Sequence, residues 1–155
     1  MADDGKVYNT YTSGMVEGVK RLCSEADIIT PNLTELRILS GENNIMIAGE
    51  KLLESCIKSV VVTGIVENGR ISNYVFSDGF VKTYETEFLE SATQGGSFSG
   101  TGDIFSSFVM GKVLNNVSIF DAVEQAVDFI SRAIKASNIK NRNDGIDFES
   151  FLKKI

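Results

Sequence analysis

The stretch SVVVTG at residues 59–64 decides the fold class of this chain. A continuous β-branched run is typical of a central strand in a parallel sheet, because helices cover such a strand on both faces. The preceding residues, 45–57, carry apolar side chains at spacings of three and four, and this pattern predicts a helix. A helix that leads into a buried strand indicates an α/β protein.

Two hairpin signals follow the central strand. Asn68-Gly69 and Asp78-Gly79 are dipeptides that favour tight turns, and each lies between segments with strand character. Residues 70–77 and 80–86 are therefore predicted to be strands that form an antiparallel hairpin at the edge of a mostly parallel sheet.

Further elements are predicted on both sides of this centre. Residues 101–114 are apolar nearly all round, so we expect that helix to be buried. The helices carry more apolar surface than so small a sheet can cover. The chain is therefore expected to be a single partial domain, residues 1–155, of a larger doubly wound fold. The remaining predictions are a helix over 14–26, a strand over 27–30, a helix over 32–40 closed by Gly41, a long helix opened by a capping box at Ser118, and a last helix over 148–153.

Composition and charge exclude several classes of function. The net charge is −6 and no basic cluster is present, which argues against a nucleic-acid partner. The chain has no histidine, and this excludes Ser-His-Asp catalysis and most zinc sites. No apolar run is long enough to span a membrane and the first residues have no signal-peptide character. We therefore expect a cytoplasmic protein in which Cys23 and Cys56 are buried free thiols.

A glycine-rich segment, GGSFSGTGD at residues 95–103, carries the strongest chemical signal. A glycine-rich loop entering a helix leaves the first backbone N–H groups unpaired, and with the helix dipole they form an anion site. The carboxylate of Asp103 would repel a phosphate that is only bound there. A carboxylate at this position is useful if it takes a proton from an attacking hydroxyl while the backbone amides hold the phosphoryl group being transferred. This combination indicates phosphoryl transfer.

The same residues also fit an ordinary helix start, because aspartate is common in the first turn of any helix. Gly95 and Gly100 have the spacing of a P-loop, but Thr101 and Gly102 stand where a P-loop has Lys and Ser or Thr. The chain is therefore not a P-loop NTPase.

A second polar group, TPNLTE at residues 30–35, lies at the predicted carboxyl end of the first strand, where open α/β sheets bind ligands. Asn32 and Glu35 are three residues apart and could order the water shell of a magnesium ion. Asn-x-x-Glu is also a capping box, and the spacing alone favours the cap, although the two roles are compatible. Thr63 and Gly64 end the central strand at the same edge, where a hydroxyl could contact a nucleotide phosphate.

Three motifs resemble the ribokinase-like superfamily, and specifically its pyridoxal and pyridoxamine kinases. They are TPNLTE at 30–35, VVVTG at 60–64 and SGTGDIFSS at 99–107, in this order. The resemblance extends over nearly the whole chain. The GTGD form looks like that of pyridoxal kinases, whereas the related hydroxymethylpyrimidine kinases usually carry a cysteine at the position of Asp103.

The resemblance implies ATP-dependent phosphorylation of the hydroxymethyl group of pyridoxal, pyridoxine or pyridoxamine, with Asp103 as the general base. It implies ATP and Mg²⁺ as cofactors and a homodimer of the full-length protein, and it leaves a monovalent-cation requirement open. The implied anion hole consists of the backbone amides of Gly100, Thr101 and Gly102. The other implied site residues are Asn32 and Glu35 for the water shell of magnesium, and Asp3, Thr30, Thr63, Gly64, Phe98 and Ser99 for ATP.

The sequence departs from this family pattern in two respects. Family members run to nearly twice this length, so the resemblance implies that the N-terminal strands and most of the vitamin pocket lie outside this chain. Gly64 stands where some relatives have serine, which removes one hydroxyl contact. Two alternatives stay open, a hydroxymethylpyrimidine kinase and a catalytically inactive nucleotide-binding fragment.

Overall fold

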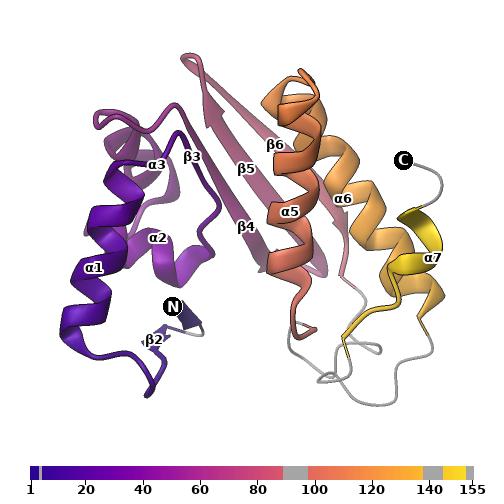
Figure 1. Ribbon diagram of the computed structural model, residues 1–155, viewed down its shortest axis with the longest axis horizontal. Coiled ribbons are helices and arrows are strands. Elements are labelled where there is room, and N and C mark those ends of the chain that lie inside the picture. The colour runs from indigo at the N-terminus through magenta and orange to yellow at the C-terminus, as the bar shows by residue number, and fades with distance from the viewer. Residues whose placement is uncertain (4, 89–97, 138–144, 153–155) are drawn as a thin grey trace. The chain divides into compact units, whose positions relative to one another are not determined.

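The computed structural model describes residues 1–3, 5–88, 98–137 and 145–152 (Figure 1). Residues 95–97 of the glycine-rich segment lie outside the described residues, as does the end of the predicted last helix. The described strands are β1 (Ala2–Asp3), β2 (Lys6–Val7), β3 (Ile28–Ile29), β4 (Ser59–Glu67), β5 (Arg70–Ser77) and β6 (Phe80–Glu87). The described helices are α1 (Ser13–Ser24), α2 (Leu33–Ser40), α3 (Ile45–Leu53), α5 (Thr101–Leu114), α6 (Ile119–Ala136) and α7 (Glu149–Leu152).

The predicted fold class is confirmed, since helices flank a mixed sheet with the strand order β3-β4-β5-β6 (Figure 1). β3 and β4 pair in parallel, with Ile29 opposite Val60. The predicted hairpins are also present. All four turn residues of Asn68-Gly69 and Asp78-Gly79 have positive φ, which is the backbone geometry that two-residue hairpin turns require.

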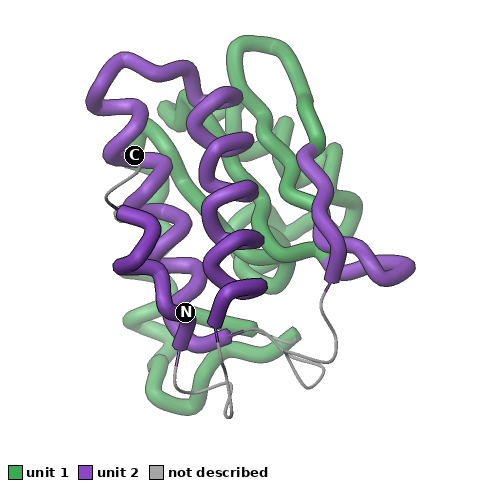
Figure 2. The backbone as a smooth tube through the Cα atoms, turned by 90° about the vertical axis from the view of Figure 1, so that its right-hand side faces the viewer, with its two compact units in different colours: residues 1–65, 72–83 green, residues 66–71, 84–155 purple. Residues whose placement is uncertain are grey.

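The chain divides into two compact units (Figure 2). Unit 1 comprises Met1–Ile65 and Ser72–Thr83, and unit 2 comprises Val66–Ile71 and Tyr84–Ile155. The division runs through the hairpin strands, and each unit has a hydrophobic cluster of its own.

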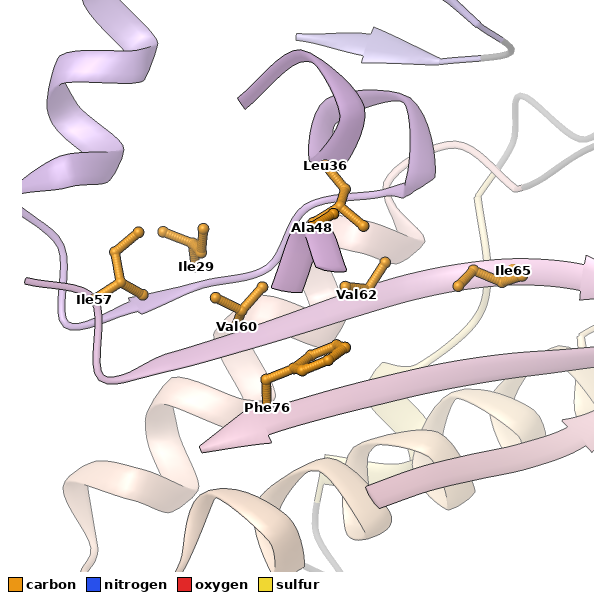
Figure 3. Close-up of a cluster of buried hydrophobic side chains, with 8 residues drawn as sticks. All are labelled: Ile29, Leu36, Ala48, Ile57, Val60, Val62, Ile65 and Phe76. Carbon is orange, nitrogen blue, oxygen red and sulfur yellow. The ribbon is translucent and has the colours of Figure 1, made fainter. Parts of the chain in front are cut away.

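The core of unit 1 forms where α2 and α3 meet the sheet. Val60, Val61 and Val62 are fully buried, as predicted for a central strand. Figure 3 shows Leu36 of α2 and Ala48 of α3 among the side chains of this core. The buried cluster consists of Ile29, Leu36, Ala48, Ile57, Val60, Val62, Ile65 and Phe76.

Helix α3 approaches strand β5 at Gly49. A Cβ atom at this position would lie 2.6 Å from the ring of Phe76, which is itself fully buried. Only glycine therefore allows this approach. The helix ends at Leu53, four residues before the predicted end at residue 57.

In unit 2, α5 and α6 pack against each other. Phe108 of α5 stacks on Phe129 of α6 with ring centroids 4.7 Å apart, a geometry that adds to simple area burial. The prediction that α5 is buried all round is wrong within the described residues. Met110 is 45% exposed and Leu114 is 74% exposed, because α5 is covered on one face only.

Two further expectations concern the cysteines and the membrane. Cys56 is exposed and Cys23 is only partly buried, so the prediction of two buried thiols is wrong. Cys56 lies beyond the end of α3, so it is not part of the buried face of that helix. No helix among the described residues combines the length and the apolar character that crossing a membrane requires.

Candidate functional site

Asn32 and Glu35 form the capping box that their spacing favours. The side-chain Oδ1 of Asn32 accepts a hydrogen bond from the backbone N–H of Glu35 at 2.9 Å. In return, Oε2 of Glu35 accepts from the backbone N–H of Asn32 at 3.2 Å. The two bonds satisfy two otherwise unpaired donors at the start of α2.

The same two side chains also bind the first residues of the chain. Nδ2 of Asn32 donates to the backbone oxygen of Ala2 at 2.7 Å. Oε1 of Glu35 accepts from the amino group of Met1 at 2.8 Å and from the backbone N–H of Ala2 at 3.3 Å. These bonds fix strand β1, which contains Asp3, beside the start of α2. Sequence reasoning missed this role, because Ala2 and Asn32 are 30 residues apart and no local pattern marks the contact.

Replacing Glu35 with glutamine is expected to destabilise the chain by about 1–2 kcal/mol, because glutamine cannot match three N–H donors with two charged oxygens. The free energy of unfolding, measured by urea titration, tests this. Glu42→Gln is the control, since Glu42 pairs with Lys51 at the surface, where such a pair contributes less than about 1 kcal/mol. Equal losses in the two variants would contradict the assigned bonding of Glu35.

The described residues offer no direct metal-binding cluster, since no group of three His, Cys, Asp or Glu side chains comes together among them. Glu35 already accepts three N–H donors. Mg²⁺ usually keeps several of its waters. The bonds of Asn32 and Glu35 therefore argue against direct coordination of Mg²⁺ and leave an approach through water as the remaining arrangement.

Thr63 lies beside Asn32 at the carboxyl end of β3. The two residues form an isolated parallel bridge, and the backbone N–H of Thr63 donates to the backbone oxygen of Pro31 at 2.9 Å. Thr30, the residue before Pro31, is partly buried at this edge. The structure thus brings Thr63 together with Asn32, and Asn32 with the strand that contains Asp3.

Strand β4 does not end at this edge but bends there and continues to Glu67. Gly64 adopts a left-handed conformation with φ of 71°, which a side chain would strain. The serine that some relatives carry at this position would be strained in this backbone, so glycine here has a conformational reason. The N–H of Gly64 donates to Oδ1 of Asn73 at 3.2 Å.

The start of α5 differs from the other capped helix starts in the described residues. Helices α1, α2, α3 and α6 each have a side-chain oxygen at the N-cap that accepts a backbone N–H. The N-cap residue of α5 is Gly100, with φ of 80°, and it makes no side-chain cap bond. Gly102 and Asp103 in its first turn are exposed. No side chain caps this helix start, and the N–H of Thr101 makes a long bond of 3.4 Å to the backbone oxygen of Phe98. An uncapped helix start of this kind suits an anion.

Phe98, two residues before the N-cap of α5, packs in the hydrophobic cluster of unit 2. Phe98 is only 3% exposed and packs in the cluster with Ala133 and Ile146. Its backbone oxygen accepts from the hydroxyl of Thr101 at 2.9 Å. Phe98 is thus a core residue that anchors the loop, whereas Ser99 is exposed.

The electrostatics around Glu35 affect one thiol. Burial raises the pKa of Cys23, and the negative charge of Glu35 raises this pKa further. The thiolate is the reactive form of cysteine, so Cys23 is unsuited to act as a nucleophile.

The predicted site residues therefore form two groups. Asp3, Thr30, Asn32, Glu35, Thr63 and Gly64 belong to unit 1, whereas Phe98, Ser99, Gly100, Thr101, Gly102 and Asp103 belong to unit 2.

The family profile of the phosphomethylpyrimidine kinases matches residues 8–146 of this chain. The chain belongs to this kinase family. The expected resemblance to ribokinase-like kinases is thereby confirmed. A hydroxymethylpyrimidine/phosphomethylpyrimidine kinase from Aquifex aeolicus is 32% identical over 144 residues, covering 87% of this chain and 54% of the relative. The chain spans about half the length of the curated relatives it matches.

Solved structures show the same fold. A Bacteroides thetaiotaomicron protein of the phosphomethylpyrimidine kinase type, crystallised with pyridoxal, has a TM-score of 0.83 and 26% identity, covering 99% of this chain and 57% of that one. The pyridoxal kinase from Staphylococcus aureus, in complex with AMP-PCP and pyridoxal, has a TM-score of 0.78 and 21% identity, covering 97% of this chain and 57% of that one. At 21% identity the similarity to the Staphylococcus aureus structure concerns the fold alone.

Proposed function

We propose that this chain supplies the nucleotide side and the catalytic base of a kinase that transfers the γ-phosphoryl group of ATP to the hydroxymethyl group of pyridoxal, pyridoxine or pyridoxamine. The observation that carries the proposal is the start of α5. Gly100 opens this helix in a left-handed conformation without a side-chain cap, and the exposed Asp103 lies in the first turn.

In this proposal the backbone amides of Gly100, Thr101 and Gly102 hold the charge that develops on the transferred phosphoryl group. Amides at a helix start are preorganised for this, since no reorganisation is needed when the charge appears. Asp103 takes the proton of the attacking hydroxymethyl group. Positioning and electrostatics supply most of the catalysis in phosphoryl transfer, so a rigid helix start suits the reaction.

The group in unit 1 is proposed to bind the nucleotide phosphates and their metal ion. The partly buried Thr63 would offer its hydroxyl to a phosphate, and Thr30 and Asp3 would assist it. Asn32 and Glu35 would order the water shell of Mg²⁺, which when bound neutralises charge on the phosphates. Ser99 and the loop anchored by Phe98 would border the nucleotide. The AMP-PCP in the similar Staphylococcus aureus structure supports nucleotide binding by this fold.

The choice of phosphoryl acceptor rests on Asp103. Aspartate at this position resembles the pyridoxal kinases, and the Bacteroides thetaiotaomicron structure contains pyridoxal. A hydroxymethylpyrimidine kinase is the second candidate, because the curated Aquifex aeolicus relative carries that name. A cytoplasmic location and a homodimer of the complete protein belong to the same proposal.

A substrate comparison tests the proposal. ADP release from Mg·ATP by the complete protein is measured with pyridoxal and with hydroxymethylpyrimidine as acceptors, alone and in competition. We expect the higher kcat/KM with pyridoxal. A higher kcat/KM with hydroxymethylpyrimidine would establish the second candidate, and nucleotide binding without transfer to either acceptor would favour the inactive nucleotide-binding fragment.

A further inference from the structure

We infer that Asn73 is a positioning residue of the nucleotide site. Its buried amide holds the left-handed bend at Gly64 and thereby sets the position of Thr63. The inference rests on the proposed function, in which Thr63 and Gly64 contact the phosphates of ATP.

The bond at Gly64 has an unusual acceptor for a strand. A backbone N–H in a sheet ordinarily donates to a carbonyl of the neighbouring strand. At Gly64 the acceptor is the side-chain Oδ1 of Asn73 on β5, at 3.2 Å. Asn73 is only 6% exposed, whereas Gly64 is exposed, so the bond joins a buried acceptor to a donor at the surface. The buried amide of Asn73 is costly to leave without this bond, because it loses its hydration on burial.

The bend is confined to one point of an otherwise regular strand. Val60, Val61 and Val62 are fully buried and Ile65 is buried again at 4% exposure. Between them Thr63 is partly buried and Gly64 is exposed. A left-handed residue inside a strand changes the direction of the side chains next to it, since alternation along the strand is interrupted. The direction of the Thr63 side chain therefore depends on whether the bend is maintained.

Thr63 is fixed from its other side by the segment that follows β3. Its N–H donates to Pro31 and it bridges to Asn32. Asn73 completes this arrangement from the β5 side. An apolar residue would be the ordinary choice for so buried a position in a strand, and a buried amide costs stability unless it is bonded. The amide at residue 73 is thus explained by the bend that it holds.

Affinity for Mg·AMP-PCP and the hydrogen exchange rate of the Gly64 amide test the inference, both measured on the full chain. Asn73→Leu keeps the branching at Cγ and removes the acceptor. We expect it to weaken Mg·AMP-PCP binding about tenfold and to accelerate exchange at Gly64 about tenfold, as follows from the loss of one hydrogen bond to a buried amide. Asn73→Ser, which is too short to reach Gly64, is the second variant and is expected to behave alike.

Ser77→Ala is the matched control. Ser77 lies on the same strand, is 3% exposed and pairs with the hydroxyl of Ser59 at 2.8 Å. Ser77→Ala removes this buried hydrogen bond, which does not involve Gly64, so we expect the affinity for Mg·AMP-PCP to be unchanged. A double variant separates positioning from general stability. If Asn73 acts through Thr63, Thr63→Val combined with Asn73→Leu binds no more weakly than Thr63→Val alone.

The outcomes separate this inference from the proposed function. A wild-type chain that does not bind Mg·AMP-PCP overturns the proposed function and this inference with it. Binding that is normal in the wild type, in Asn73→Leu and in Asn73→Ser overturns this inference alone. Losses that multiply in the double variant overturn it as well, because they show that Asn73 acts independently of Thr63.

Discussion

Replacing Asp103 with asparagine is expected to lower kcat for phosphoryl transfer by the complete kinase by about 10²–10⁴-fold. Asparagine has nearly the shape of aspartate but cannot take the proton of the attacking hydroxyl. The backbone amides at the start of α5 remain, so the affinity for Mg·ATP should change little. Steady-state kinetics give kcat, and calorimetric titration gives the nucleotide affinity.

Asp121→Asn is the matched control for this experiment. Asp121 occupies the same position in the first turn of α6 as Asp103 does in α5. Its side chain accepts the hydroxyl of Ser118 at 2.7 Å, as an ordinary helix-start residue does. If Asp103 were only a helix-start residue, both variants would lose about 0.3–1 kcal/mol of stability and keep their activity. A near-normal kcat in Asp103→Asn would contradict its role as the base.

Replacing Phe76 with alanine is expected to destabilise the chain by about 3–5 kcal/mol. Phe76 is fully buried in the core of unit 1 (Figure 3). Its ring packs against the backbone of Gly49. Because Gly49 has no side chain that could move into the space, the cavity should stay largely open. The cost then combines lost burial with an unfilled cavity. Urea unfolding followed by circular dichroism measures it.

Phe80→Ala provides the same chemical change at an exposed position. Phe80 lies on β6 and is 66% exposed, so its removal should change the free energy of unfolding by less than about 1 kcal/mol. Similar losses in the two variants would contradict the core assignment.

Local patterns predicted the elements well, because their signals lie within a few residues. The valine run at 60–62 predicted the buried strand, and Gly41 closes α2 with φ of 74° as expected of a C-cap. The predicted end of β4 was wrong, because a glycine such as Gly64 commonly marks the end of a strand in sequence. In the structure its left-handed backbone bends the strand and does not end it.

Which faces of a helix are covered by other elements was harder to predict than where the helix lies in the sequence. The apolar sequence of α5 indicated burial on all sides, yet a sequence does not state which faces receive a partner. The capping box of Asn32 and Glu35 was predictable from its three-residue spacing. Their bonds to Ala2, and the bond of Asn73 to Gly64, join segments distant in sequence, and neither has a local signature. The only sequence signal at Asn73 is an amide inside a strand.

Calorimetric titration of the purified chain with Mg·AMP-PCP tests the central claim, that this chain carries the nucleotide side of a kinase. The account predicts saturable binding at one site per chain. A chain that is folded by circular dichroism but shows no saturable binding of the nucleotide up to millimolar concentrations would contradict it.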